Sequence, residues 1–127
     1  MTGFWVYILL CDNGSYYTGY TDDVLKRYRL HLDGSGKCKY TRSFKPVSIA
    51  QCWRIEGDKA FAMKLERDIK KLSRHKKSAL ISQPSLLTDD PRVIPGLELL
   101  SLLKDSISVH NITRYNFYKL TTAKIVA

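Results

Sequence analysis

The hydrophobic pattern at the start of the chain predicts two strands joined by a tight turn. The run Phe4–Cys11 is apolar, aromatic or β-branched throughout, which is typical of a central strand buried on both faces. Asp-Asn-Gly at residues 12–14 then supplies turn residues, and Tyr-Tyr-Thr-Gly-Tyr at residues 16–20 supplies residues that favour strands. We therefore expect a β-hairpin here.

A helical pattern follows the hairpin. Thr21 can cap a helix that begins at Asp22 and Asp23, because acidic residues in the first turn suit the helix dipole. The apolar stripe of this helix is Val24, Leu25, Tyr28 and Leu32. Glycines in Asp33–Lys37 end the helix, and we expect the basic segment Lys37–Lys45 to be a loop.

The pattern then predicts one more strand and two more helices. Val47–Glu56 alternates as a strand does, and Asp58 can cap a helix over Lys59–Leu72. Ser73 can cap a third helix over Arg74–Ser82. The order β-β-α-β-α-α predicts an α/β (α+β) sandwich, in which helices flank a small, three-stranded, largely antiparallel sheet.

The composition changes after residue 83. Residues 1–83 carry 16 basic and 8 acidic residues, whereas residues 84–127 carry 5 and 4. We therefore expect a domain over residues 1–83 and a C-terminal extension of unknown role over 84–127. Leu97–Leu103 is a candidate helix and Tyr115–Leu120 a candidate strand. The extension is expected to be dispensable for the fold, unless its leucines cover an apolar face of the domain.

Charge and cysteine content restrict the partners and the compartment. The net charge of +9 favours a polyanion, meaning nucleic acid or an anionic membrane surface. Three cysteines without paired spacing favour a reducing cytoplasm over a disulfide framework or a zinc site. The run Phe4–Leu10 is too short to span a membrane and lacks the features of a signal peptide. Gly-Ser-Gly-Lys-Cys at residues 34–38 is not a Walker loop, and we expect no tightly bound organic cofactor.

The hairpin register decides whether Tyr7 and Tyr17 share a face of the sheet. A two-residue turn at Asn13 and Gly14 would pair Tyr7 with Tyr20 and send Tyr17 to the other face. A three-residue turn would pair Tyr7 with Gly19 and place both tyrosines on one face. The second form favours glycine at its last position, where Gly14 stands, and only this form makes a site.

Three further side chains could join these tyrosines at the helix margins. Arg27 and His31 are an i,i+4 pair at one edge of their helix's apolar stripe, and Glu66 lies just outside the stripe of its own helix. Each has an ordinary alternative. Strand tyrosines are usually core residues, an Arg–His pair is usually a solvated face, and Glu66 with Lys70 is an ordinary helix ion pair.

Taken together, these residues resemble the GIY-YIG nuclease family, and in particular its small, stand-alone bacterial members. Trp-Val-Tyr, ending at Tyr7, stands at the first motif, with Trp5 and Val6 in place of Gly-Ile. Tyr-Thr-Gly at residues 17–19 stands at the second motif. The resemblance runs in order from about Phe4 to about Ile81. It places the catalytic residues at Tyr7, Tyr17, Arg27, His31 and Glu66.

The resemblance implies hydrolysis of phosphodiester bonds in nucleic acid, with DNA as the expected substrate. A tyrosine would take the proton of the attacking water, and Arg27 would stabilise charge on the phosphoryl oxygens. Glu66 would bind one divalent ion, Mg²⁺ or Mn²⁺. His31 would protonate the leaving oxygen or position the phosphate. The residues expected to bind phosphate and the flanking strand are Gly19, Tyr20, Lys37, Lys39, Arg42, Lys70 and Lys71.

Two other functions fit parts of the sequence. The same fold could be a nucleic-acid-binding module with little catalysis, because Tyr20 stands where some family members carry a lysine that lowers a phenol pKa. The chain could instead be a protein-interaction domain that uses Leu97–Leu103 as its docking face.

Overall fold

The chain folds around an antiparallel sheet whose central strands are β1 and β3. The computed structural model describes residues 3–34 and 38–100. The strand order is β2-β1-β3-β4, with β1 at Phe4–Cys11, β2 at Tyr16–Thr21, β3 at Pro46–Ile55 and β4 at Val93–Pro95. The expected mixture of helices and antiparallel sheet is confirmed.

The expected number of three strands is wrong, because β4 adds a fourth. This strand pairs with the end of β3, where Ile55 lies opposite Val93 and Trp53 opposite Pro95. Three residues that end in a proline give little strand signal, so only the pairing with β3 identifies β4. In the chain it follows the predicted helix over Arg74–Ser82.

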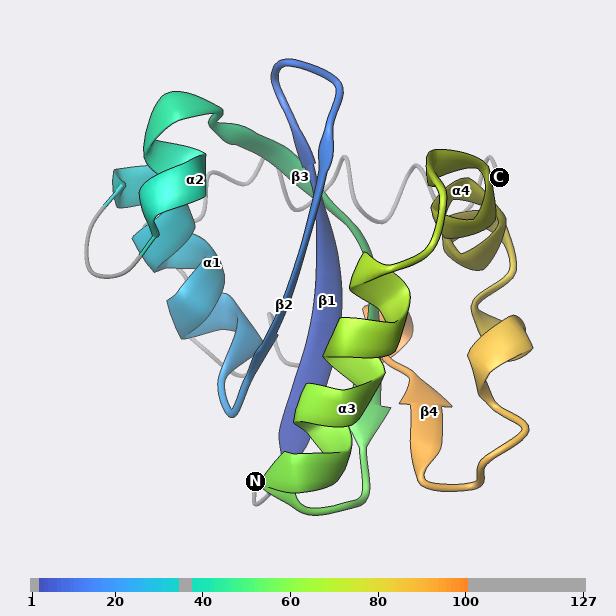
Figure 1. Ribbon diagram of the computed structural model, residues 1–127. Helices are drawn as coiled ribbons and strands as arrows, with labels where there is room; N and C mark the ends of the chain where they lie inside the picture. The colour runs from blue at the N-terminus through green and yellow to red at the C-terminus, as the bar shows by residue number, and fades with distance from the viewer. Residues whose placement is uncertain (1–2, 35–37, 101–127) are drawn as a thin grey trace.

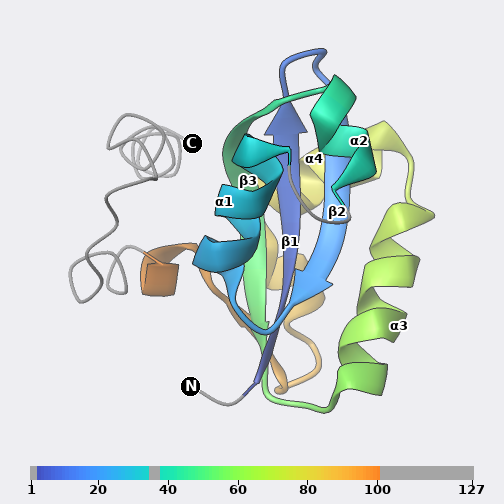
Figure 2. The same ribbon diagram turned by 90° about the vertical axis from the view of Figure 1, so that its left-hand side faces the viewer.

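Helices cover both faces of the sheet (Figures 1 and 2). Helix α1, Val24–Asp33, packs on one face, with the short helix α2, Lys39–Ser43, beside it. Helix α3, Lys59–Lys70, and helix α4, Arg74–Ser82, lie on the other face. A 3₁₀ turn, η1, occupies Pro84–Leu87. The fold therefore has three layers, with the sheet in the middle.

The side chains of β1 point alternately to the two faces of the sheet, so each face has its own hydrophobic cluster. Trp5, Tyr7 and Leu9 point toward α1, and they pack with α1 residues such as Leu25 and Tyr28. Val6 and Ile8 point the other way, into a second cluster with residues of α3 and α4. Because both faces are covered, β1 is buried along almost its whole length, as its continuous apolar sequence predicts.

The hairpin takes the register that brings the two tyrosines to one face. The backbone N–H of Cys11 donates to the carbonyl of Ser15 at 2.9 Å, which encloses three turn residues. The last of these, Gly14, has a left-handed φ of +81°. Tyr7 therefore lies opposite Gly19, and Leu9 lies opposite Tyr17.

Side-chain caps fix where the helices begin. The predicted caps Asp58 and Ser73 are confirmed, since each accepts a hydrogen bond from a backbone N–H of its own helix. The predicted start of α1 is wrong by two residues. Asp23 caps it, by accepting from the N–H of Lys26, while the hydroxyl of Thr21 accepts from the N–H of Asp23.

Part of the expected basic loop is helical. Residues 39–43 form α2, although its N-cap residue Cys38 makes no capping bond through its side chain. A five-residue helix is too short to show an apolar period, so the sequence gives no signal for it. Contacts with α1 hold it instead. Lys37, which was expected to bind phosphate, lies outside the described residues.

Residues 84–100 return across the sheet and complete the core. Leu97 and Leu100 are buried in the cluster beneath α1, and the indole N–H of Trp53 donates to the carbonyl of Pro84 at 2.9 Å. These leucines do cover an apolar face, which is the exception stated above to a dispensable extension. The domain boundary at residue 83 stays a prediction. The rest of Leu97–Leu103 and the candidate strand Tyr115–Leu120 lie outside the described residues.

The helices are short for a bilayer. Within residues 3–34 and 38–100, none is long and apolar enough to cross a membrane.

Candidate nuclease site

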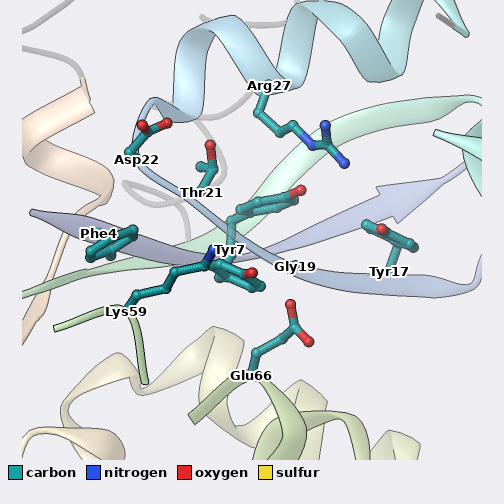
Figure 3. A pocket seen from close by; sticks show the side chains of 10 residues that line it. Phe4, Tyr7, Tyr17, Gly19, Thr21, Asp22, Arg27, Lys59 and Glu66 are labelled. Atoms are coloured by element: carbon teal, nitrogen blue, oxygen red, sulfur yellow. The ribbon is translucent and has the colours of Figure 1, made fainter. Parts of the chain in front are cut away.

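An open cleft lies along the β2 edge of the sheet, between α1 and α3 (Figure 3). Its volume is about 510 Å³, which suffices for a nucleotide-sized group. The side chains around it come from both faces of the sheet. The lining residues are Phe4, Tyr7, Tyr17, Gly19, Tyr20, Thr21, Asp22, Arg27, Lys59 and Glu66.

The phenol of Tyr7 lies directly over Gly19. A Cβ placed on Gly19 would lie 2.6 Å from Cζ of Tyr7 and closer still to its hydroxyl oxygen, so no larger residue fits this position. The Tyr7 ring itself fills the space that a side chain at this position would need. Gly19 thus lets the phenol reach across β2 to the cleft.

A buried chain of hydrogen bonds runs from Tyr7 into the protein. The hydroxyl of Tyr7 lies 2.9 Å from Nε2 of His31, and Nδ1 of His31 lies 2.8 Å from Oγ1 of Thr41. The hydroxyl of Thr41 donates its proton to the carbonyl of Cys38 at 3.3 Å, so it accepts from Nδ1–H of His31. Nε2 is then unprotonated and accepts the phenolic proton of Tyr7.

Burial sets the protonation states along this chain. It lowers the pKa of His31 to about 4, and the positive charge of Arg27 acts in the same direction. Burial also raises the pKa of Tyr7 above that of a free phenol, together with the neighbouring Tyr17, while Arg27 opposes this shift. Tyr7 is therefore a neutral hydrogen-bond donor at pH 7, and His31 is a neutral acceptor.

Arg27 and Tyr17 approach the Tyr7 phenol from two further directions. Arg27 extends from α1 with its guanidinium toward the phenol (Figure 3). Among the described residues, its buried Nε–H finds no acceptor, so it retains donor capacity. The ring of Tyr17 lies 6.5 Å from that of Tyr7 and packs edge-on against His31 at 5.0 Å.

Glu66 reaches the cleft from the opposite layer. It lies on α3, with its carboxylate pointing toward Gly19 and the tyrosines (Figure 3). Its side chain is only 13% exposed, and Oε1 pairs with Nζ of Lys70 at 3.2 Å. Both anticipated features of Glu66 are therefore present, because it pairs with Lys70 and also lines the cleft.

The structure brings together most of the predicted site residues and separates others. Tyr7, Tyr17, Arg27 and Glu66 all line the cleft, as do Gly19 and Tyr20. His31 is fully buried behind Tyr7, so it reaches the cleft only through that phenol. The other predicted phosphate-binding residues that the structure describes lie on α2 or α3, outside the lining, and these are Lys39, Arg42, Lys70 and Lys71.

The donor set of the cleft suits a divalent ion that is also held by substrate. A Glu66 carboxylate and phenolic oxygens are hard ligands of the kind that Mg²⁺ prefers. Throughout the described ranges, no three His, Cys, Asp or Glu side chains gather as a metal-binding group. One carboxylate accepts a divalent ion when phosphate and water oxygens complete the coordination.

Sequence reasoning missed two residues of the site. Lys59, at the start of α3, lines the cleft and brings a positive charge to it. Thr41 fixes the tautomer of His31 from within the segment that was expected to be a loop. Neither could be found from a motif, since a helix-start lysine and a loop threonine are both common surface residues.

Comparison with known proteins identifies the family of the chain. The family of the GIY-YIG catalytic domain matches residues 3–79. The UPF0213 protein BH0048 of Halalkalibacterium halodurans is 46% identical over 78 residues, which cover 61% of this chain and 81% of that protein. The UPF0213 protein FN1575 of Fusobacterium nucleatum is 40% identical over 87 residues, covering 68% and 85%.

A solved structure is also similar. The solution NMR structure of the UPF0213 protein BH0048 from Bacillus halodurans is 40% identical, covers 72% of this chain and 92% of that one, and superposes with a TM-score of 0.38. The family match spans more than half of the chain and includes every cleft residue, from Phe4 to Glu66. The protein belongs to the GIY-YIG family.

Proposed function

We propose that the protein is a metal-dependent endonuclease that hydrolyses phosphodiester bonds, with DNA as the expected substrate. One observation carries this proposal. Tyr7 from β1, Arg27 from α1 and Glu66 from α3 converge on one cleft beside Gly19. A phenol, a guanidinium and a carboxylate are the proton acceptor, the anion stabiliser and the metal ligand that hydrolysis of a phosphodiester needs. The net charge of +9 supports a polyanionic substrate.

Tyr7 takes the proton of the attacking water in this mechanism. As the O–H bond of the water breaks, its proton passes to the Tyr7 hydroxyl, while the phenolic proton passes to Nε2 of His31. No free phenolate has to form, which matters because burial raises the pKa of this phenol. Thr41 keeps the accepting nitrogen of His31 directed at Tyr7.

His31 acts through Tyr7 in this scheme, not on the leaving oxygen. Its imidazole is fully buried and neutral, so it neither touches the substrate nor carries a proton to donate. The water oxygen forms its bond to phosphorus, the bond to the leaving oxygen breaks in line, and solvent protonates that oxygen. The proton on His31 then returns through the Tyr7 hydroxyl to solvent, which restores both groups. Of the two roles that the resemblance allowed for His31, neither fits its burial.

Arg27 and Glu66 stabilise the charge that develops during this step. The Arg27 guanidinium lines the cleft and binds the non-bridging phosphoryl oxygens. Glu66 would hold one Mg²⁺ or Mn²⁺ at the cleft, and the absence of a side chain at Gly19 lets the Tyr7 phenol reach the same cleft. The ion, when bound, supplies Lewis-acid stabilisation of charge on the leaving oxygen.

The cations outside the cleft bind the flanking backbone. Lys39 and Arg42 on α2 lie to one side of the cleft, and Lys70 and Lys71 lie at the end of α3. Contacts of this type add sequence-independent affinity and position the strand. Leu97 and Leu100, two residues of the docking face in the protein-interaction alternative, are buried in the protein's own core and are not available to a partner.

The charge of Glu66 is the sharpest test of this proposal. The Glu66→Gln variant keeps the size of the side chain, and should cleave plasmid and oligonucleotide substrates with Mg²⁺ about 10²-fold more slowly. Its affinity for the same oligonucleotide, measured in EDTA, should be unchanged or slightly higher, because a negative charge has been removed beside the phosphate.

Asp68 provides a matched control on the same helix. It forms an equivalent i,i+4 ion pair with Lys64 at 3.0 Å, but on the solvent-exposed side. The Asp68→Asn variant should cleave at the wild-type rate, since losing such a pair costs only about 0.2–0.5 kcal/mol of helix stability. Full activity in Glu66→Gln would overturn the metal-binding role of Glu66. Wild-type protein that binds nucleic acid but cleaves none would favour the binding-module alternative.

A further inference from the structure

A continuous row of aromatic side chains leads out of the cleft toward the surface. The ring of Tyr17 lines the cleft and stacks on Tyr40 of α2, with the centroids 5.7 Å apart and the planes inclined by 25°. Tyr40 in turn packs on Phe44, which caps the C-terminal end of α2, at 5.2 Å. The row therefore connects the cleft to a surface at α2.

The outer two rings of this row are unusually exposed. Tyr40 and Phe44 are each 38% exposed, and among the described residues only Leu86 is also an exposed large apolar side chain. Leu86 lies on η1, far along the chain from α2. The nuclease fold does not need aromatic rings at this surface to fill a core, so their exposure calls for another reason.

The platform made by Tyr40 and Phe44 is held rigidly relative to the cleft. The Tyr40 hydroxyl lies 2.6 Å from Oγ of Ser15 at the hairpin turn, and Oγ of Ser15 donates to Oδ1 of Asn13 at 2.6 Å. The next residue, Thr41, is buried and tied to His31. Since the rings are already in place, a ligand that stacks on them pays little ordering entropy.

The charge around the platform identifies its occupant. The segment 38–53, which contains α2, carries three basic residues and no acidic one, and two of the basic residues, Lys39 and Arg42, belong to α2 itself. Flat exposed rings beside cations are the arrangement that binds nucleic-acid strands, where bases stack on the rings and phosphates meet the cations. An apolar protein helix would gain nothing from these cations.

This inference rests on the nuclease function proposed above and defines its substrate more closely. We propose that Tyr40 and Phe44 form a stacking platform for an unpaired base of the strand whose phosphate occupies the cleft. A base within a duplex already stacks on its neighbours on both faces, so it cannot also stack on these rings without leaving the helix. The preferred substrate therefore carries a single-stranded segment beside the scissile phosphate.

Binding of matched oligonucleotides by the full-length protein tests the platform. Fluorescence anisotropy in EDTA compares a labelled single strand of about 16 nucleotides with the duplex of the same sequence. Phe44→Leu keeps an apolar side chain but removes the flat ring, and should weaken single-strand binding about fivefold or more. Duplex binding, which depends on the cations, should be unchanged.

Two further variants serve as controls. Phe44→Trp keeps a flat ring and should retain the single-strand affinity of the wild type. Leu86→Ala removes the other exposed large apolar side chain, and should leave both affinities unchanged. The melting temperature of each variant shows whether the protein is folded, so that a loss of binding can be assigned to the ring.

The possible outcomes separate the platform from the nuclease function. Unchanged single-strand affinity in Phe44→Leu, or an equal loss for single strand and duplex, would overturn the platform and leave the Glu66→Gln test of cleavage standing. A selective loss of single-strand binding supports the platform. If that loss occurs in a protein that cleaves nothing, the platform stands and the nuclease function fails.

Discussion

The hydroxyl of Tyr7 and Nε2 of His31 lie 2.9 Å apart, and neither side chain is appreciably exposed to solvent. A proton can leave the cleft through this contact without entering bulk water. The acceptor lies on the inner side of the phenol, so it does not compete with substrate for space. This geometry makes the protonation state of His31 the quantity on which both stability and chemistry depend.

The low pKa of His31 makes stability dependent on pH. In the unfolded chain His31 takes up a proton near its ordinary pKa of 6.5, whereas in the folded protein the pKa is about 4. The unfolded state therefore binds more protons between these values, and the free energy of unfolding falls as the pH drops through this window. The free energy of unfolding should have fallen by about 3 kcal/mol once the pH is below the folded-state pKa. Chemical denaturation at several pH values measures it.

Replacing His31 separates its contribution to the pH dependence of stability from the contribution of Asp and Glu side chains. The His31→Gln variant should be less stable at neutral pH, but its stability should fall less steeply between pH 6.5 and pH 4. Equal slopes in the two proteins would contradict the buried, neutral imidazole.

Removing the hydroxyl of Thr41 should impair the reaction from a distance. In Thr41→Val, Nδ1–H of His31 loses its acceptor, and the imidazole gains by moving its proton to Nε2. Nε2 can then no longer accept from Tyr7. We expect kcat to fall by about 10²-fold, the contribution typical of a positioned base, with little change in KM. Nitrogen chemical shifts of the imidazole report the tautomer directly.

Thr41→Ser is the matched variant, since it keeps the hydroxyl and loses only a methyl group. It should retain the wild-type tautomer and most of the activity. A valine variant whose tautomer and rate both match the wild type would show that Thr41 only packs.

Gly19→Ala should disable the site by displacing Tyr7. The new Cβ would meet Cζ of the phenol at 2.6 Å, so the ring must move and its bond to His31 must break. A misplacement of about 1 Å at a reacting group is enough to cost about 10²-fold in rate. Initial rates of oligonucleotide cleavage measure the loss.

Gly14→Ala separates this effect from a general loss of stability. Gly14 has a positive φ of +81°, but a Cβ there would meet nothing within 4 Å. Alanine should therefore destabilise the turn by about 1–2 kcal/mol and leave the cleavage rate of the folded protein unchanged. Comparable rate losses in the two variants would contradict the clash with Tyr7.

Residues 84–100 should be needed for stability. Leu100 is 1% exposed and packs beneath α1, so Leu100→Ala should lower the free energy of unfolding by about 2–5 kcal/mol. Leu99→Ala, at a partly buried neighbour, should cost less. A chain that ends at Gln83 loses β4 and both buried leucines, and should aggregate or melt at a much lower temperature. An unchanged melting temperature would instead support an independent domain over residues 1–83.

Much of the sheet and the cleft could be predicted because residues close together in the sequence determine these features. A continuous apolar run makes β1 central, and Gly14 at the third turn position selects the register that joins Tyr7 to Gly19. Helical periodicity likewise placed Arg27 and Glu66 at the margins of their helices. These features depend on a few neighbouring residues, which is the range over which sequence patterns are informative.

The missing parts depend on tertiary contacts. Helix α2 is too short to show an apolar period, and β4 is recognisable only beside β3. His31 looked half exposed on its own helix, but α2 covers it, and Thr41 of α2 then fixes its tautomer. Because the sequence does not predict α2, it does not predict the burial of His31 or its contact with Thr41 either.

The cleft has one structural requirement that concerns the sheet as a whole. Tyr7 belongs to the layer beneath α1 and Glu66 to the layer of α3, and they meet only because β2 is the outermost strand on that side. A strand from another molecule that paired with β2 would lie between the two layers and separate Tyr7 from Glu66. Edge pairing along β2 and the proposed cleavage are thus mutually exclusive in this architecture. A peptide that mimics such a strand should inhibit the proposed cleavage without contacting a reacting atom.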